Sequence, residues 1–349
     1  MIPMSQPILS PVHYSPGLWR LAAQRLWSDA IGRYSFLVVA GYLLVVVAVL
    51  FGWVAQDWDR EVAVNYAPPS GWVTAANRVV VPPSTLVVSG PVPLYGWTDP
   101  LEPQWSQAQT YARTASREAP HYLLTLPFGA DKWGRDVGKK LLKGTQTSVW
   151  VGLVSALVAT LLGTFLGALA GYYGRWTDDA LNGLYGVLTA IPYLLLVFAV
   201  AAVFQQKGVG TLILILGLTG WTGVFRLVRA EYFKHRSREY VLAAGALGAS
   251  HGRRIWIHIL PNVSHIVLVQ FSQNLVGFIK SEVILSFLGF GVPVSSVSWG
   301  SMLNEAQNEL ILGKWWQLAV TAVAMAIFVT AVSLLTDAMR DALDPRLRQ

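Results

Sequence analysis

Residues 226–262 read RLVRAEYFKHRSREYVLAAGALGASHGRRIWIHILPN, a basic segment that separates two apolar stretches. Ser237 is expected to cap a helix whose first turn holds Glu239, because a carboxylate suits the positive end of a helix dipole. A second short helix over residues 253–260 is expected to stop at Pro261, since proline cannot continue a helix interior. The first helix consists mainly of small residues, so another protein could approach its backbone closely. The pattern predicts either a docking helix or an ordinary helical hairpin between membrane spans.

The composition is that of a membrane protein. Hydrophobic residues make up 54% of the chain and charged residues 13%, where a soluble domain carries about 25% charged residues. The chain has no cysteine, which excludes a disulfide framework and a thiolate metal site. The net charge of +7 is concentrated near the ends of apolar stretches and not in a patch of the kind that binds nucleic acid.

Six stretches approach the roughly 20 apolar residues that a membrane span needs. The first is too long for the core of a signal peptide, so it is read as an uncleaved anchor, the first transmembrane helix, over residues 36–55. We therefore predict an all-α polytopic bundle of six spans: Phe36–Val54, Val149–Tyr172, Leu181–Phe204, Val209–Phe225, Val263–Leu288 and Trp316–Leu335.

The distribution of Lys and Arg predicts the orientation. Positive residues gather in the short segments that are cytoplasmic if both termini are inside, above all in residues 226–262. The two short loops on the other side carry one lysine each, Lys207 and Lys314. Because cytoplasmic loops are enriched in positive charge, we expect both termini and residues 226–262 on the cytoplasmic side.

The long first loop, residues 56–127, is expected outside the cytoplasm. It is rich in Pro, Gly, Val and Trp, and runs such as Val79–Val81 and Leu86–Val88 indicate short strands between turns. The sequence predicts a β-rich or irregular insertion, either as a structural elaboration or as a contact surface for a substrate-delivery protein.

Several motifs resemble the permeases of bacterial ATP-binding-cassette importers. The 226–262 segment resembles their cytoplasmic coupling loop, and the closest version is that of the C-type subunit of dipeptide and oligopeptide permeases. The resemblance covers the chain from about Phe128 to its C-terminus. The motifs that carry it are residues 128–137 (FGADKWGRDV), 239–250, 258–262, 282–291 (EVILSFLGFG), 299–303 (WGSML) and 341–347 (DALDPRL).

The resemblance implies a division of the chain and a docking role for its basic loop. The permease domain would cover residues 128–338, between a cytoplasmic N-terminal segment (1–35) with the anchor and insertion after it and a cytoplasmic tail (339–349). Residues 237–261 would contact partner ATPases. The residues that it assigns to coupling are Glu239, Tyr240, Ala243, Ala244, Gly248, Ala249, Ser250 and Pro261.

The resemblance also implies the partners and the cargo. The chain would be a multi-pass protein of the bacterial inner membrane, a permease subunit without enzymatic activity or cofactor, embedded in the lipid bilayer. It would pair with a second homologous permease, two ATPase subunits and an extracytoplasmic substrate-binding protein, and would carry di- or oligopeptides. A permease for another cargo, such as a nickel chelate or a sugar, and an ATP-independent channel or carrier remain alternatives.

Polar residues follow one face of the third expected span and one face of the fifth. A water-filled path needs such faces, and hydrogen bonds between helices use them as well. Because the similar permeases place these helices around their path, we expect the following residues to line it: Asn182, Tyr185, Thr189, Gln270, Gln273, Asn274 and Ser281.

Four charged residues near the outer ends of spans are gate candidates: Lys280, Glu282, Arg135 and Asp136. Charges inside spans are costly, which makes them functional candidates. The alternative for Glu282 is a hydrogen bond to a neighbouring helix, and Lys280 would then extend to the interface. Asp136 is also placed to cap a short amphipathic helix lying at the outer interface.

Two other patterns are weaker. Residues 248–252 match the Gly-x-Ser-x-Gly pattern of serine hydrolases, but that chemistry requires a strand before Ser250. His251, His258 and His265 recur every seven residues, although Pro261 interrupts the helix and no carboxylate is close in sequence. No metal site is therefore expected.

Overall fold

A computed structural model describes residues 24–72, 122–204, 208–293 and 295–343. These residues form helices and no strand; three isolated bridges join residues 61–69 to residues 123–135, and a fourth pairs Ala130 with Asp136. The predicted all-α bundle is confirmed. A β-rich or irregular insertion was expected over residues 56–127; its described part contains a single 3-10 turn, η1 (Ser70–Trp72), and is otherwise irregular, so the β-rich alternative is not supported there. The two expected strands, Val79–Val81 and Leu86–Val88, lie outside the described residues.

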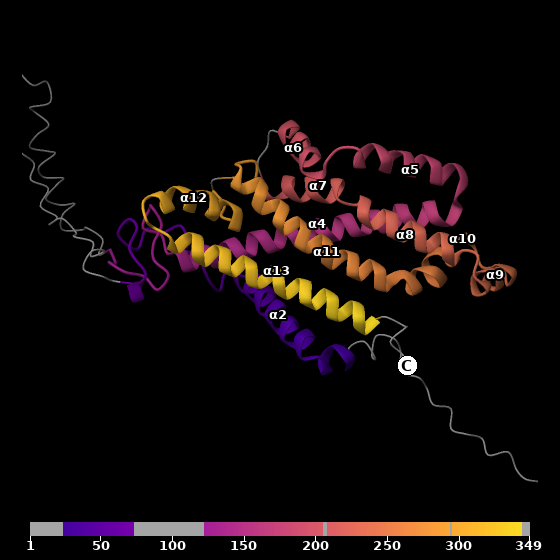
Figure 1. Cartoon of the computed structure of the whole chain (residues 1–349), viewed down its shortest axis with the longest axis horizontal. Helices are drawn as coiled ribbons and strands as arrows, with labels where there is room; N and C mark the ends of the chain where they lie inside the picture. Colours follow the sequence, from indigo (N-terminus) through magenta and orange to yellow (C-terminus); the bar gives the residue numbers. More distant parts are fainter. Residues whose placement is uncertain (1–23, 73–121, 205–207, 294, 344–349) are drawn as a thin grey trace, which may run out of the picture.

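The first and last spans lie side by side. Helix α2 (Ala30–Leu50) begins at Asp29, whose carboxylate accepts hydrogen bonds from the backbone of Ile31 and Gly32. It packs along α13 (Trp316–Leu343), and the Tyr42 hydroxyl donates to the Ala324 carbonyl at 2.8 Å. Both helices have their cytoplasmic ends toward one end of the molecule (Figure 1), as the predicted orientation requires.

Helix α4 (Val137–Tyr173) is the central element of the bundle. Asp136 caps it, as predicted, by accepting from the backbone N–H groups of Gly138 and Lys139. The prediction of a short amphipathic helix at the outer interface is wrong, because residues 137–143 form the first turns of the long span. Lys140 in these turns is buried.

The third span is broken. Helix α5 (Arg175–Thr189) and helix α6 (Tyr193–Val203) meet at an angle of 88°. Pro192 lies at the N-cap position of α6. The break occurs here because proline lacks the backbone N–H that a continuous helix would need. The third expected span is therefore sharply bent at this proline.

The fourth span is longer than predicted. Helix α7 (Val209–Thr219) is followed by α8 (Thr222–His235), so helical structure continues ten residues past the expected end at Phe225. Helix α8 packs closely on α4, where Gly163, Gly167 and Gly171 face the backbone of α8. Glycines allow this approach because they present no side chain.

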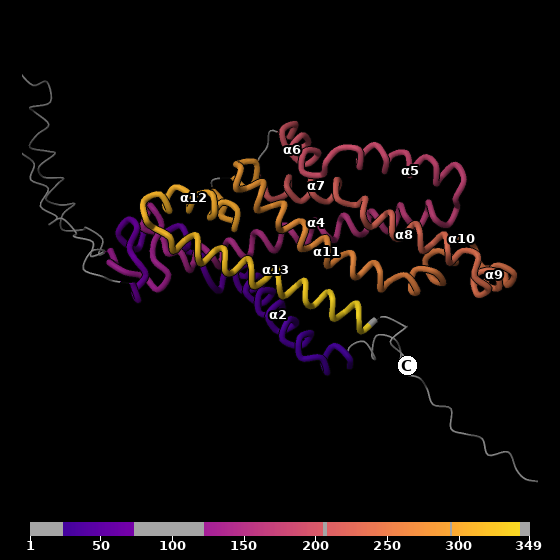
Figure 2. The backbone as a smooth tube through the Cα atoms, in the orientation of Figure 1, coloured from indigo at the N-terminus to yellow at the C-terminus, as the bar shows by residue number. Residues whose placement is uncertain are grey.

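The remaining helices complete the two ends of the bundle. At one end lie α9 (Glu239–Ala246), α10 (His251–Arg253) and the π-helical turn η4 (Arg254–Ile259), which leads into the fifth span, α11 (Leu260–Phe287). At the other end lies α12 (Trp299–Ile311), a helix that the sequence reading did not predict. Figure 2 shows α9 and α12 at opposite ends of the tube.

The expected number of spans agrees with the described helices. Five of them are long and apolar enough to cross a membrane, and the bent pair α5–α6 makes six if it counts as one span.

Candidate functional site

Helix α9 projects from the bundle and is attached by few contacts (Figure 1). Among its eight residues only Val241 is buried, and it packs with Val224, Val228 and Val263. Of the predicted coupling residues, Ala244 and Ala249 are half-buried; the others are exposed, namely Glu239, Tyr240, Ala243, Gly248, Ser250 and Pro261. The surface that they form is free to contact another protein.

The predicted cap of α9 is wrong. The hydroxyl of Ser237 donates to the Lys234 carbonyl at 3.3 Å, so it belongs to the end of α8. Arg238 occupies the cap position without a side-chain hydrogen bond, while Glu239 lies in the first turn as expected. The helix dipole and the apolar anchor at Val241 therefore stabilise α9 in place of a capping side chain.

A turn at Gly248 ends α9. Its φ of +86° is one that residues with a side chain rarely adopt. Ser250 then caps α10, because its hydroxyl accepts from the Arg253 N–H at 3.3 Å. A helix precedes Ser250 where a hydrolase would need a strand. The Ser250 hydroxyl therefore has a structural role, as the cap of α10.

The second predicted helix does not stop at Pro261. This proline lies in the first turn of α11, where a missing N–H costs nothing. The turn η4 precedes it, and the Tyr232 hydroxyl of α8 donates to the Ile255 carbonyl at 3.2 Å. The coupling segment is thus continuous with the fifth span.

Tyr240 joins α9 to both neighbouring spans. Its hydroxyl hydrogen-bonds with Nδ1 of His235, at the end of α8, at 2.9 Å. It also accepts from Nδ2 of Asn262, near the start of α11, at 3.5 Å. Burial raises the pKa of Tyr240 above its ordinary value of 10.0, so the hydroxyl keeps its proton. A displacement of α9 would act on two spans through one side chain.

Two apolar side chains of this segment were missed in the sequence. Leu242 is 58% exposed and Leu247 is 89% exposed. Both leucines lie within residues 239–250, where the sequence analysis considered the small residues and not the leucines. Leucines exposed this far outside a bilayer are typical of a surface that another protein covers.

The polar faces of the third and fifth spans lie on separate elements. Asn182, Tyr185 and Thr189 belong to α5, which packs on α4 and α8. Tyr185 contacts the ring of Phe225, and Thr189 donates to the Tyr185 carbonyl. Within this chain the third-span residues therefore form a partly exposed face of their own.

On α11 the predicted path residues divide into two groups. Gln270 and Gln273 hydrogen-bond to each other at 2.9 Å. Asn274 donates to Thr160 of α4 at 3.4 Å, and the buried Ser281 donates to the Gly277 carbonyl. Within the described ranges the two glutamines therefore bond inside their own helix, while Asn274 holds α11 against α4.

The gate candidates have different surroundings. Glu282 is fully buried and accepts from Ser148 of α4 at 2.7 Å and from Ser286 at 2.6 Å. Lys280 is exposed. Arg135 lies 5.8 Å from the ring of Trp58, and Asp136 caps α4. The structure does not bring these four charges together.

A buried charged cluster at the outer end was not predicted. Lys140 Nζ donates to Asp131 at 2.8 Å and to Glu305. Glu309 is also buried; its Oε1 accepts from the Lys132 N–H, whereas its Oε2 has no hydrogen-bond partner among the described residues. Burial, together with the charges of Asp131 and Glu305, raises the pKa of Glu309 to about 7 against the opposing effect of Lys140.

The three histidines do not converge on a metal site. Nδ1 of His251 is 2.9 Å from the Tyr172 hydroxyl and also contacts Arg254. Across the part of the chain that the structure describes, no group of three or more His, Asp or Glu side chains is arranged to hold a metal ion.

Known proteins are similar to this chain in sequence. Residues 163–349 match the family described as binding-protein-dependent transport system inner membrane component. The dipeptide transport system permease protein DppC of Bacillus subtilis is 37% identical over 222 residues, which cover 64% of this chain and 69% of that protein. The oligopeptide transport system permease protein OppC of the same organism is 34% identical, with coverages of 64% and 72%. A solved chain of the MetNI methionine ABC transporter in an inward-facing conformation is 15% identical, with a TM-score of 0.48, over 59% of this chain and 96% of that one.

Proposed function

The chain belongs to the family of binding-protein-dependent transport system inner membrane components, and on that premise we propose that it forms half of a translocation path for di- or oligopeptides. It is the multi-pass permease subunit of an ATP-binding-cassette importer, and ATP hydrolysis takes place on a separate subunit. The peptide cargo is supported by the two relatives, which are named as dipeptide and oligopeptide permeases. A nickel chelate or a sugar is the alternative cargo.

Membership in this family implies an ATPase and a substrate-binding protein as partners. The assembly that we propose contains a second, homologous permease and two ATPase subunits, with one coupling segment bound by each ATPase. The binding protein would deliver the peptide on the outer side. An ATP-independent channel would leave the projecting helix α9 without a role.

The observation that carries the proposal is the attachment of α9. The helix exposes most of its surface, yet Tyr240 ties it to the ends of both α8 and α11. Closure of the ATPases on ATP would move α9, and the tie would pass this motion to the two spans. Because α8 packs on α4 through glycines, the spans would move together between inward- and outward-open states.

The polar residues would then face the path in the assembled pair of permeases. Among the residues that the structure describes, Gln270 and Gln273 hydrogen-bond only to each other. Asn182 and Thr189 are exposed on α5. These uncharged groups suit a peptide, whose amides need hydrogen bonds along the way and whose charges would be trapped by a fixed opposite charge.

The test compares Leu247→Asp with Ile311→Asp in the transporter purified with its companions. Leu247 and Ile311 are both aliphatic and highly exposed, with 89% and 81% of the residue accessible to solvent. They belong to segments at opposite ends of the molecule (Figure 1). If α9 binds the ATPase, Leu247→Asp should lose most of the co-purified ATPase and of ATP-driven peptide uptake. Ile311→Asp should keep the ATPase.

Two results would contradict this proposal. Normal uptake and normal ATPase content in Leu247→Asp would remove the coupling role of α9. Uptake of a sugar or a nickel chelate, without uptake of any peptide, would leave the coupling role intact and overturn the cargo.

A further inference from the structure

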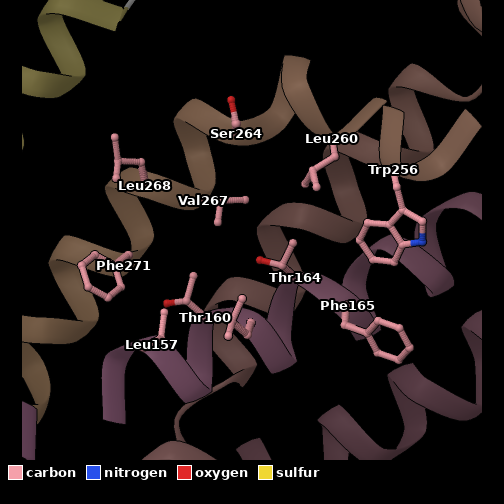
Figure 3. A pocket seen from close by; sticks show the side chains of 11 residues that line it. Leu157, Thr160, Thr164, Phe165, Trp256, Leu260, Ser264, Val267, Leu268 and Phe271 are labelled. Atoms are coloured by element: carbon pink, nitrogen blue, oxygen red, sulfur yellow. The ribbon is translucent and has the colours of Figure 1, made fainter. Parts of the chain in front are cut away.

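A cavity of about 680 Å³ lies between α4 and α11, next to the turn η4 (Figure 3). Its α4 wall includes Leu157, Leu161 and Phe165, and its α11 wall includes Val267 and Phe271. The three α4 side chains are also substantially exposed. The cavity therefore opens on the lateral surface of the bundle.

The cavity lies in the inner half of the bilayer. Counted along α4 from Val149, where the expected span begins, Leu157 is ~12 Å and Phe165 ~24 Å into a hydrocarbon core about 30 Å thick, at a rise of about 1.5 Å per residue. Trp256 of the turn η4 closes the cytoplasmic end and stacks on Phe165, with ring centroids 5.9 Å apart. Tryptophan at this level is typical of the boundary between hydrocarbon and headgroups.

The cavity lies beside the face of α11 that carries two of the expected path residues. Leu260, Ser264 and Phe271 of α11 line the cavity, whereas Gln270 and Gln273 lie roughly a third of a turn away, at about 3.6 residues per turn. Asn274, also an expected path residue, donates to Thr160 in the cavity lining, so the two faces adjoin there.

The lining indicates a slender apolar ligand. It contains no Gly or Ala, the residues that let a neighbouring helix approach closely in a membrane. Bulky Leu, Phe and Trp side chains leave a hollow between them, which a flexible hydrocarbon chain can fill and a helix cannot.

One polar group in the lining has no partner. Thr164 is 8% exposed and lines the cavity near Phe165 (Figure 3), and its hydroxyl has no hydrogen-bond partner among the described residues. By contrast, Thr160 accepts from Asn274, and Ser264 donates to the Pro261 carbonyl. The Thr164 hydroxyl is therefore available to donate a hydrogen bond to the ester carbonyl of a lipid whose hydrocarbon chain fills the cavity.

Positive charge lies at the cytoplasmic end. Arg253 is exposed three residues before Trp256, and Arg254 follows it. Basic residues beside an intramembrane cavity on the cytoplasmic side favour anionic lipid headgroups. We propose that the cavity binds one acyl chain of an anionic phospholipid of the inner leaflet, with the phosphate at Arg253.

The test uses the complete transporter with its companions, reconstituted in nanodiscs of phosphatidylcholine with a trace of phosphatidylglycerol that carries a diazirine on one acyl chain. After irradiation, mass spectrometry locates the label. We expect it on peptides covering residues 157–165 and 256–271. Leu161→Trp should lower this labelling about tenfold or more, because each methylene displaced from apolar contact weakens binding about fourfold. Val267→Phe narrows the same cavity from α11 and should act in the same direction.

The matched control is Leu195→Trp, which makes the same change at an exposed position of α6 outside the cavity and should leave the labelling unchanged. Arg253→Gln should abolish the preference for a phosphatidylglycerol probe over a phosphatidylcholine probe, and Arg253→Lys should retain it.

Three outcomes would overturn the proposal. Equal labelling of the cavity and of the α5–α6 face would mean ordinary surrounding lipid. Crosslinks from cavity residues to the companion permease, without lipid label, would mean a protein interface. Displacement of the label by saturating dipeptide would mean a cargo site.

Discussion

Tyr240 concentrates the link between the coupling helix and the membrane in one hydroxyl. It contacts His235 of α8 and Asn262 of α11. Tyr240→Phe removes both hydrogen bonds and keeps the ring. At about 1 kcal/mol for each bond, we expect α9 to remain folded and the peptide taken up per ATP hydrolysed to fall severalfold.

The control for this change is Tyr173→Phe. Tyr173 is a half-exposed tyrosine whose ring contacts Tyr172 and His251. It lies at the end of α4 and does not contact α9. Its substitution should leave the ratio of uptake to hydrolysis unchanged. An equal loss in both variants would show that Tyr240 has no special part in coupling.

Glu309 makes stability depend on pH. Its pKa of about 7, above its ordinary value of 4.5, means that folding favours the protonated carboxyl. The stabilisation is therefore complete below pH 4.5 and is lost as the pH rises to about 7, an effect of about 1 to 3 kcal/mol. The thermal midpoint of the purified transporter should fall across this window. It should fall less in Glu309→Gln, which imitates the protonated state; parallel slopes would exclude Glu309 as the titrating group.

Neither residue role could be predicted from the sequence in full. The motif placed Tyr240 in the coupling loop, but its two partners come from helices whose meeting depends on the fold. Lys140 and Glu309 are 169 positions apart, and no motif links them. Only packing of α12 and α13 on the start of α4 buries them together.

At the scale of helices, the length of each apolar stretch predicted most of the spans, but not where each helix ends or bends. The fifth span was expected over Val263–Leu288 and is α11, Leu260–Phe287. The extension of α8 to His235 was missed because its last turns are polar, and only contact with α4 and η4 stabilises them. The third span was expected as one continuous stretch, and the size of its bend at Pro192 depends on what α5 and α6 pack against.

The close packing of α4 and α8 gives a prediction at this scale. A Cβ added to Gly163 would lie 2.6 Å from the Trp221 carbonyl oxygen and 2.7 Å from the Val224 Cβ. Gly163→Ala should therefore force the helices apart and cost about 1 to 3 kcal/mol, seen as a lower thermal midpoint. Gly183→Ala in α5 is the matched control, since its Cβ would meet nothing within 4 Å. It should be neutral or slightly stabilising.

The topology of the whole molecule follows from the directions of its helices. Helix α4 runs from the outer end to the cytoplasmic end, and α7 with α8 runs the same way, because α8 leads into the coupling segment (Figure 1). The chain between them must return to the outer side, so the bent pair α5–α6 has to cross the membrane despite its 88° angle.

Single cysteines can test this crossing, since the chain has none of its own. A membrane-impermeant maleimide should label Trp176→Cys and Leu247→Cys only from the cytoplasmic side, and Ile311→Cys only from the outside. Phe204→Cys, at the end of α6, decides the matter, because a crossing pair places it outside and a re-entrant loop places it inside. We expect labelling from the outside. Labelling from the cytoplasm would mean that α7 begins on the cytoplasmic side, and the prediction of six spans would be wrong.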